Sequence, residues 1–488
     1  MIKFLKQPLL WLLVILCLAF VMRLYKLDSP IADWHSWRQA DTAAVARNFY
    51  KEGFNIFYPK GDDMSQISET GKFNPLRLRY VEFPIYNAVV YAAYLLHGGV
   101  SEPLARLVSI IFSLGSIVLM YFLTKKYFGQ GTALLAALLF AVLPYSIYYS
   151  RVILPEPSLI FFGLGMVYFT DRWIWESSKS TFGLAVIFSI LAFLTKPTVI
   201  FYTLPLLYSY YLKEKGLFPI PKKYIGFVSL VLAPLLIWRL WINIHPEGIP
   251  SSAWLLNGNG IRFRPAFWRW IINDRFSREL LSPVGVFVFI LGLVLRPLKN
   301  ENLFLHLFAV GAFLYLIVFA TGNVQHDYYQ TLIVPAICIF TARGLWLMLK
   351  GLPLFLPRIV TIPLAIFLLS LTLGLTWYEI KGLYQINNPI IVEVGRKADT
   401  LLPKDAVVIA PYNGDTAFLY QINRTGFPVV AASFEDLIKD FGVTHYVSTN
   451  YDNDTATVLK KYKVIEQTPK YVIADLRYPS STSGAVIK

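Results

Sequence analysis

The chain has 488 residues, of which 56% are hydrophobic and only 15% are charged, and its formal net charge is +15. So many apolar residues exclude a soluble globular protein and indicate a polytopic membrane protein. The basic residues lie mainly in short connections and membrane-flanking loops, which indicates orientation in a bilayer and contact with anionic head groups or phosphates rather than with nucleic acid. The two cysteines, Cys17 and Cys338, lie inside apolar runs, so the sequence offers no disulfide framework.

The first apolar run covers residues 8–22 and follows Lys3 and Lys6. It resembles a signal sequence, but it has no small-x-small cleavage site before Arg23. We therefore predict an uncleaved first span with a cytoplasmic N-terminus. The polar and aromatic residues that follow predict a long outer loop, at residues 26–103.

Within that loop, residues 33–50 gather acidic, imidazole, guanidinium and indole side chains into a short stretch. Asp41 opens a run in which apolar residues recur with helical periodicity. Two hypotheses follow for Asp41. In the first, its carboxylate caps the helix by accepting backbone N–H groups. In the second, it is a general base at a reaction centre.

Residues 84–96 are apolar but shorter than the ~20 residues of a perpendicular span. If they cross the bilayer, the lysines at 125–126 and 213–223 fall outside; if they lie along the outer surface, those lysines fall inside. The positive-inside rule favours the surface position. Further spans are then expected at residues 104–123, 131–147, 158–169, 182–194, 199–212, 225–244, 284–295, 304–320, 331–348 and 359–376. With about eleven spans in total, the C-terminal region lies on the outer side.

A second outer loop is expected at residues 245–282. Its residues 262–278 mix arginines with aromatic side chains, which suits an interfacial helix with rings at head-group level and guanidinium groups on phosphates. An ordinary aromatic belt that only anchors the loop is the alternative.

From about residue 377 the composition becomes that of a soluble domain. Helices are expected at residues 392–401, 416–422 and 434–441, and strands at residues 406–410, 444–448, 463–465 and 471–475. The turn at residues 412–415 lacks the glycine spacing of a dinucleotide site, so we interpret it as structural or acceptor-facing. Residues 480–488 are expected to be disordered. The predicted fold class is a polytopic α-helical membrane protein, residues 1–376, with a small extracytoplasmic α/β domain, residues 377–488.

Four polar residues are expected at the outer ends of the spans, where charges are costly and usually face a cavity or a partner. Each has a structural alternative: Glu82 as a turn acid, Glu156 in an ion pair with Arg151, Lys196 reaching the head groups, and His326 as a hydrogen-bonded interfacial residue. Together they suit one chemistry. Cations and the N-terminus of the helix opened at His326 hold a lipid phosphate, and a carboxylate deprotonates an incoming hydroxyl.

These motifs, with Glu-Phe-Pro at 82–84, Arg-x-x-x-Pro-Glu at 151–156, Thr-Lys-Pro at 195–197 and His-Asp-Tyr-Tyr at 326–329, resemble those of the class C (GT-C) integral-membrane glycosyltransferases. The resemblance is to the bacterial branch similar to protein O-mannosyltransferases and to the lipid A aminoarabinose transferase. It implies a polyprenyl-phosphate-linked sugar donor and inverting transfer on the non-cytoplasmic face. Members differ in their use of a divalent metal, so Mg²⁺, Mn²⁺ or Zn²⁺ is a candidate cofactor.

Carried over to this sequence, the resemblance implies that Asp41 and Glu156 are catalytic. Asp33 is the alternative to Asp41, because Gln39-Ala40-Asp41 stands where many relatives have adjacent Asp-Glu. Glu82 and His326 are the candidate metal ligands. The donor-binding candidates are Arg38, Arg151, Lys196, Arg262, Arg264, His326, Tyr328 and Tyr329.

The sequence thus predicts a hexosyl- or pentosyltransferase of the inner or plasma membrane, with Asp41 as base and a protein, lipid or glycan as acceptor. A carrier or flippase of polyprenyl-linked sugars without covalent chemistry is the alternative. It would place charges along a path through the middle of the spans. A third hypothesis is a binding module in which the outer domain is functional and the spans only anchor it. Anchoring, however, requires far fewer spans than the sequence contains.

Overall fold

The computed structural model describes residues 7–295, 301–351 and 356–480. The chain forms two compact units. We call Met1–Leu27, Arg106–Arg239 and Ser252–Tyr384 the helical unit, and Asp28–Ala105, Leu240–Ser251 and Gln385–Lys488 the mixed unit.

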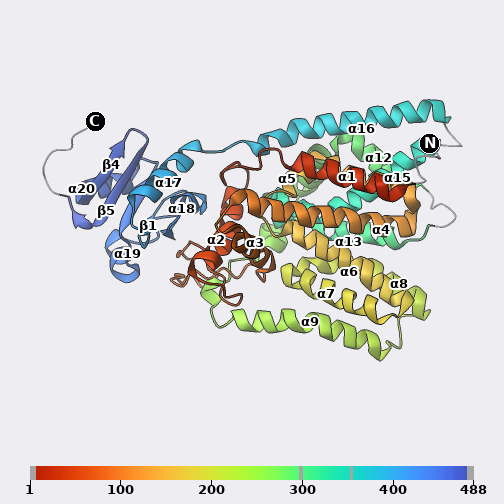
Figure 1. Ribbon diagram of the computed structural model, residues 1–488, viewed down its shortest axis with the longest axis horizontal. Coiled ribbons are helices and arrows are strands. Elements are labelled where there is room, and N and C mark those ends of the chain that lie inside the picture. The colour runs from red at the N-terminus through yellow and green to blue at the C-terminus, as the bar shows by residue number, and fades with distance from the viewer. Residues whose placement is uncertain (1–6, 296–300, 352–355, 481–488) are drawn as a thin grey trace. The chain divides into compact units, whose positions relative to one another are not determined.

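The helical unit consists of apolar helices that pack lengthwise, α6 against α7, α12 against α15 and α13 against α8 (Figure 1). Every apolar segment predicted from residue 104 onward coincides with a helix or with part of one, although the total of eleven spans stays a prediction. By length and composition, 5 helices of the described residues could cross a membrane, and shorter apolar helices accompany them. The helices are α1 (Pro8–Arg23), α4 (Glu102–Val142), α5 (Pro144–Tyr149), α6 (Glu156–Glu176), α7 (Lys179–Thr195), α8 (Leu204–Glu214), α9 (Lys222–Ile242), α12 (Ser282–Val294), α13 (Phe304–Val318), α14 (Ala320–Gln325), α15 (Val334–Lys350) and α16 (Arg358–Ile380).

Gly129 divides the long helix α4 into the two segments that the sequence predicted. Its φ of 81° and ψ of 171° are not helical, and a glycine adopts them without the penalty that a Cβ would bring. Glycines elsewhere let helices approach closely. A Cβ on Gly344 of α15 would lie 2.1 Å from the carbonyl oxygen of Val288 in α12, so only glycine fits there.

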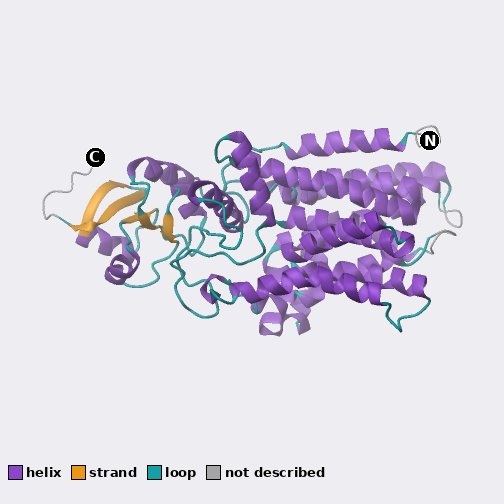
Figure 2. Ribbon diagram, turned by 60° about the horizontal axis from the view of Figure 1, so that its bottom comes forward, coloured by secondary structure: helices purple, strands orange, loops and turns teal. Residues whose placement is uncertain are grey.

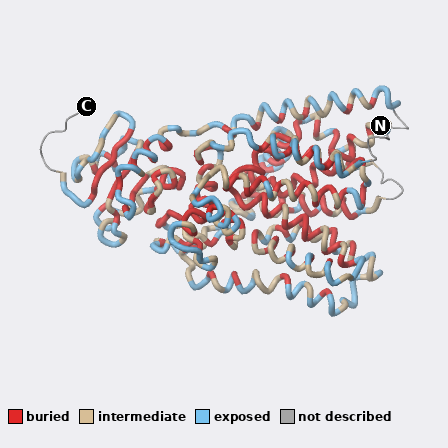
Figure 3. The backbone as a smooth tube through the Cα atoms, in the orientation of Figure 1, coloured by how far each residue is buried: buried red, intermediate tan, exposed pale blue. Residues whose placement is uncertain are grey.

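Burial separates central helices from peripheral ones (Figure 3). In the apolar stretch of Asp327–Lys350, 83% of the residues are buried, against 17% in Lys222–Ile242. Exposed apolar surface of this extent is unstable in water but not against lipid tails. The packing therefore agrees with the multi-pass membrane protein that the composition predicted.

Residues 254–281 connect α9 to α12 through short helical pieces, α10 (Trp254–Asn257), the 3-10 helix η4 (Gly258–Phe263), α11 (Pro265–Arg269) and the π-helical η5 (Trp270–Leu281). The predicted helix at residues 262–278 thus exists, in a broken form. Its interfacial position stays a prediction.

The mixed unit contains helices α2 (Ser36–Glu52) and α3 (Ile85–His97) and a five-stranded sheet of order β2-β1-β3-β5-β4 (Figure 2). Strands β2, β1 and β3 run parallel, whereas β5 is antiparallel to both β3 and β4. The strands are β1 (Val407–Ile409), β2 (Thr425–Phe427), β3 (His445–Ser448), β4 (Tyr462–Thr468) and β5 (Tyr471–Pro479), and the helices beside them are α17 (Pro389–Leu401), α18 (Ala417–Ile422), α19 (Phe434–Phe441) and α20 (Asn453–Lys461).

The predicted helices and strands of residues 377–479 are confirmed, but β2 and α20 were missed. β2 is three residues long with a glycine at its centre, so it carries no alternating pattern. α20 is polar and short, although the side chain of Asp452 caps it by accepting a bond from the Thr455 N–H at 2.9 Å. Residues 481–488 of the expected disordered tail lie outside the described residues.

The first outer loop packs onto this sheet. The N–H of Gly426 in β2 donates to the carbonyl of Asp62 at 2.9 Å, and the N–H of Met64 donates to the carbonyl of Gly426 at 2.8 Å. Met64 belongs to the same hydrophobic core as Ile409 and Phe427. The predicted outer loop and the predicted C-terminal domain therefore build one compact unit.

Candidate functional site

Asp41 lies inside helix α2 rather than at its start. The helix begins at Ser36, after His35, whose φ of 55° is left-handed. The hypothesis that Asp41 caps the helix is therefore wrong. The first helical turn is polar, so the apolar periodicity from which the start was inferred appears only one turn later.

Asp41 is buried, with 5% of its surface exposed. Each oxygen of its carboxylate has one partner. Oδ2 forms an ion pair with Arg79, and Oδ1 accepts a hydrogen bond of 2.9 Å from the hydroxyl of Thr416. A carboxylate has roughly four lone-pair sites, so these contacts orient Asp41 and still leave it able to accept a proton. Neither Arg79 nor Thr416 was predicted, because 38 and 375 positions separate them from Asp41.

Arg38 lies one turn before Asp41 on α2 and binds Glu82. Its Nη2 lies 2.6 and 2.8 Å from the two carboxylate oxygens, and the two side chains are 6% and 9% exposed. Glu82 was a candidate metal ligand, yet its carboxylate is neutralised by Arg38. The described residues contain no group of three or more His, Cys, Asp or Glu side chains that could hold a metal ion. A metal-binding role for Glu82 and His326 stays a prediction.

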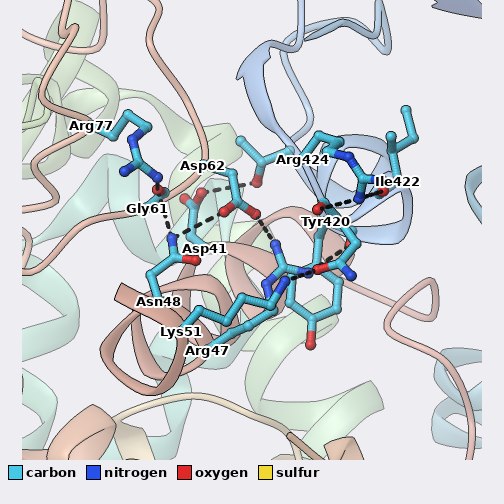
Figure 4. Close-up of polar contacts among 12 residues, drawn as sticks. Asp41, Arg47, Asn48, Lys51, Gly61, Asp62, Arg77, Tyr420, Ile422 and Arg424 are labelled. Atoms are coloured by element: carbon cyan, nitrogen blue, oxygen red, sulfur yellow. Dashed lines mark hydrogen bonds and ion pairs between the residues drawn. The ribbon is translucent and has the colours of Figure 1, made fainter. Parts of the chain in front are cut away.

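A second buried network fixes α2 in place (Figure 4). Arg47 forms an ion pair with Asp62 and donates to the carbonyl of Tyr420 at 2.9 Å. The amide of Asn48 donates to the carbonyl of Gly61 at 2.8 Å and to Asp62 at 3.1 Å. Because charge-assisted bonds of this kind are short and directional, they hold the helix that carries Asp41 rigidly within the mixed unit.

Asp33, the alternative to Asp41, is fully buried. Its Oδ1 accepts a bond of 2.7 Å from the side chain of Gln39, and its carbonyl accepts one of 3.2 Å from Asn387. These contacts give Asp33 a place in the packing of the segment that leads into α2.

In the helical unit, Lys196 forms an ion pair with Glu156. Glu156 opens α6, and Lys196 stands between α7 and the 3-10 helix η2 (Pro197–Thr203). The ammonium group also lies 5.7 and 5.3 Å from the ring centroids of Tyr328 and Tyr329. The Lys196 side chain is 15% exposed. Three predicted site residues, Glu156, Tyr328 and Tyr329, thus surround the Lys196 ammonium group.

A small cavity of about 20 Å³ adjoins Glu156, enough for about one water molecule. The Oε2 atom of Glu156 is buried and has no hydrogen-bond partner among the described residues. A water molecule bound there would donate a hydrogen bond to Oε2 and would itself bond to the hydroxyl groups that line the cavity. Its lining includes Ser113, Ser116, Tyr145, Ser146 and Thr331.

Arg151 and His326 both contact neighbouring residues of the helical unit. Arg151 is fully buried; it donates to the carbonyl of Lys26 at 2.9 Å and lies 4.6 Å from the ring centroid of Tyr384. These contacts fix Arg151 in the interior of the helical unit. The ring of His326 lies 5.5 Å from that of Tyr328 and 5.7 Å from that of Trp254.

The 3-10 helix η6 (Asp327–Ile333) follows His326, and its first residue is itself an acid. The carboxylate of Asp327 lies 3.8 Å from Arg275, a pair that the sequence did not predict. A phosphate site at this N-terminus stays a prediction.

The arginines of the second outer loop bind backbone carbonyls. Arg262 donates to Ile317 at 2.6 Å and to Val318 at 2.7 Å, and Arg264 donates to Asn259 at 2.8 Å. These bonds hold the loop. A donor-binding role for Arg262 and Arg264 stays a prediction.

Comparison with protein families and curated proteins gives partial matches. The family described as dolichyl-phosphate-mannose-protein mannosyltransferase matches residues 84–238, less than half of the chain. This range includes Glu156 and Lys196 but not Asp41. An uncharacterized protein of Aquifex aeolicus is 37% identical over 101 residues, which are 21% of this chain and 23% of that protein. The alignment thus spans less than a quarter of that relative's length.

Solved structures match along nearly the whole chain. ArnT of Cupriavidus metallidurans bound to undecaprenyl phosphate has a TM-score of 0.59 at 14% identity, covering 95% of this chain and 98% of that one. The oligosaccharyltransferase AglB of Archaeoglobus fulgidus, with an inhibitory peptide and dolichol-phosphate, has a TM-score of 0.55 at 12% identity, covering 96% and 75%. The chain therefore has the fold of the class C membrane glycosyltransferases, as its motifs predicted.

Proposed function

We propose that this protein is a membrane glycosyltransferase that moves a hexosyl or pentosyl group from a polyprenyl-phosphate donor to an acceptor hydroxyl. The proposal rests on one observation: the carboxylate of Asp41 is buried, and two partners, Arg79 and Thr416, fix its direction. Support comes from the shared fold, since ArnT is described with undecaprenyl phosphate and AglB with dolichol-phosphate. The family matching residues 84–238 is likewise named for a dolichyl-phosphate sugar.

Asp41 is the general base. It accepts the proton of the acceptor hydroxyl as the oxygen attacks the anomeric carbon, and the bond from that carbon to the phosphate oxygen breaks. Attack opposite the leaving phosphate inverts the anomeric configuration. Arg79 and Thr416 fix the direction of the carboxylate, which lowers the entropic cost of reaching the reactive geometry.

Lys196 binds the donor phosphate. In the structure its charge is neutralised by Glu156, and the two tyrosine rings beside it hold the ammonium in place. A lipid phosphate carries negative charge and competes with Glu156 for this cation. A water molecule in the adjoining cavity would then hydrogen-bond to Glu156. Arg38, Arg151, His326, Arg262 and Arg264 are proposed to add positive charge or hydrogen bonds on the donor side.

The proposed location is the inner or plasma membrane, with a cytoplasmic N-terminus and the C-terminal domain on the non-cytoplasmic side. The acceptor is a protein, a lipid or a glycan. The excess of lysine and arginine in the connections assigned to the cytoplasmic side supports this orientation.

The test is a transfer assay with purified protein and undecaprenyl-phosphate hexose or pentose. The acceptor is supplied as the envelope fraction of cells that lack the protein, which retain it unmodified. Asp41→Asn keeps the size of the side chain but removes the base, so we expect a fall in kcat of roughly 100-fold or more. Asp440→Asn, at an exposed acid of α19 in the same unit, is the control. Undiminished transfer by Asp41→Asn would remove Asp41 from the mechanism.

A further inference from the structure

The turn between α8 and α9 exposes a group of apolar side chains. Residues 215–221 form this turn, with the sequence Lys-Gly-Leu-Phe-Pro-Ile-Pro (Figure 1). Phe218 is 82% exposed, Leu217 53% and Ile220 45%. The hydroxyl of Tyr210 in α8 donates to the carbonyl of Leu217 at 3.3 Å, which ties one side of the turn to the helix. Three neighbouring apolar side chains at one tip indicate a contact with an apolar surface.

Lysines stand on both sides of this tip. They are Lys213, Lys215, Lys222 and Lys223. The ammonium group of Lys213 donates to the carbonyl of Trp175 in α6 at 3.3 Å, and that of Lys223 lies 3.2 Å from the carboxylate of Glu214. Lys215 and Lys222 are exposed, and neither forms an ion pair with any residue that the structure describes.

Helix α4 brings two more lysines to the same end of the helical unit. Lys126 forms an ion pair with Asp171 of α6, and Asp171 also accepts a hydrogen bond of 2.6 Å from Ser209 of α8. Ser209 precedes Lys213 by one helical turn, so Lys126 lies beside the ends of α6 and α8 that carry the turn. Lys125, the residue before Lys126, is exposed. Lysines of α4, α8 and α9 therefore gather at one end of the unit.

The acids in the last turns of α6 and α8 are already paired. Asp171 is fully buried with Lys126, and Glu176 pairs with Arg172 at 2.7 Å. Glu214 accepts a hydrogen bond of 2.8 Å from the hydroxyl of Tyr224 and also pairs with Lys223. These acids therefore do not neutralise the other exposed lysines around the turn, and an anion from outside the chain can do so.

Exposed apolar side chains flanked by lysines fit the surface of a bilayer that contains anionic phospholipids. The apolar residues enter the boundary between head groups and acyl chains, and the ammonium groups bind the head-group phosphates. The positive-inside rule places this end of the helices at the cytoplasmic leaflet, where anionic phospholipids lie. An acidic soluble protein matches the lysines equally well, but the exposed apolar tip favours the lipid.

We propose that the α8–α9 turn and the lysines around it form a binding site for anionic phospholipids. The site is separate from the proposed donor site. Helix α6 begins at Glu156, the partner of Lys196, and has Trp175 in its last turn, so the two sites lie roughly 28 Å apart along the helix. Only 17% of the apolar stretch of α9 is buried in the protein. A head group bound by lysines of both helices holds the start of α9 beside α8.

The test measures lipid binding to the full chain, purified in detergent, by native mass spectrometry during titration with phosphatidylglycerol or phosphatidylcholine. We expect the wild type to bind phosphatidylglycerol in preference. Lys215→Gln/Lys222→Gln should weaken phosphatidylglycerol binding roughly 10-fold or more, because two ammonium groups no longer meet phosphates. Lys215→Arg/Lys222→Arg keeps both charges and should bind as the wild type does. Phe218→Ser should weaken the binding of both lipids.

The control is Lys439→Gln/Lys470→Gln, which removes two exposed lysines of the C-terminal domain and should bind both lipids as the wild type does. Folding is measured by thermal unfolding without added lipid, where the midpoint of Lys215→Gln/Lys222→Gln should equal that of the wild type because both side chains are exposed. Phosphatidylglycerol should then raise the wild-type midpoint more than that of this variant.

Equal affinity of the wild type for the two lipids would overturn the inference, as would undiminished phosphatidylglycerol binding in Lys215→Gln/Lys222→Gln. Weakened binding in Lys215→Arg/Lys222→Arg would also contradict it, because the charge of the lysines would then not be the cause. The measurement involves no sugar transfer, so its outcome does not depend on the proposed function.

Discussion

Several buried charged side chains in this protein form pairs of opposite sign. Arg38 pairs with Glu82, Arg47 with Asp62, and Lys196 with Glu156. Removal of one member of a buried pair leaves an uncompensated charge and costs about 3–5 kcal/mol. Variants that keep the pair neutral therefore separate the structural role of such residues most cleanly from the functional one.

Lys196 offers such a comparison. Lys196→Met should lower the free energy of unfolding by about 3–5 kcal/mol, because Glu156 is left charged and buried. The double variant Lys196→Met/Glu156→Gln removes both charges and should recover most of that loss. In both variants the KM for the lipid-linked donor should rise roughly 10-fold or more, because the phosphate has lost a cation.

Thermal unfolding in detergent and donor titration measure these effects, with Lys439→Met at an exposed lysine as the control. If the double variant regains both stability and the wild-type KM, Lys196 is structural and binds no phosphate.

Residue types and spacing allowed Asp41, Glu82, Glu156 and Lys196 to be singled out, but not their partners. Arg79 follows Arg77 in a stretch that alternates arginine with apolar residues, and this pattern is the one signal of a buried cation that the sequence carried. Thr416 carried none. A hydroxyl that meets a carboxylate 375 positions away depends on how the chain folds back, which no local pattern encodes.

At the scale of elements, strand β2 depends on one glycine. Gly426 has a φ of 150°, and a Cβ there would lie 1.9 Å from the carbonyl oxygen of Val408 in β1. The backbone of Gly426 also bonds to Asp62 and Met64 of the first outer loop. A side chain at this position would therefore separate β2 from β1 and disturb the loop that precedes Arg79.

Gly442 provides a matched comparison, since its φ is 66° but nothing lies within 4 Å of a Cβ. Gly442→Ala should lower the free energy of unfolding by about 1–2 kcal/mol, the penalty for a Cβ in a left-handed backbone conformation. Gly426→Ala should add an overpacking cost of about 1–3 kcal/mol. Thermal unfolding in detergent compares the two variants, and equal midpoints would show that the β1–β2 contact tolerates a side chain.

Helices that are marked by a long apolar run or by an N-cap residue were predicted well. The long apolar helices follow from runs of residues that only lipid or a protein core can accept. Helix α19 was placed correctly because Ser433 precedes a strongly amphipathic run. The start of α2 was misplaced because its first turn, which includes Arg38 and Gln39, is buried by polar contacts rather than by apolar packing.

At the scale of the whole molecule, the two compact units divide the predicted site residues. Asp41, Arg38 and Glu82 belong to the mixed unit, while Glu156, Lys196 and the two tyrosines belong to the helical unit. The first outer loop and the C-terminal domain are far apart in sequence. Their shared core, the β2 contacts and side-chain bonds such as that of Arg47 to Tyr420 join them. The sequence did not predict that the first outer loop packs with the C-terminal domain.

The most direct test of the central claim is the fate of the lipid donor. Purified protein in detergent is mixed with undecaprenyl-phosphate sugar and the envelope fraction of cells that lack the protein, and the lipid is followed by mass spectrometry. Without a bilayer, a carrier cannot be mistaken for an enzyme. The account predicts that free undecaprenyl phosphate accumulates only when the acceptor fraction is present, and that Asp41→Asn abolishes this accumulation. Intact donor after full incubation with hexosyl and pentosyl lipids would contradict it.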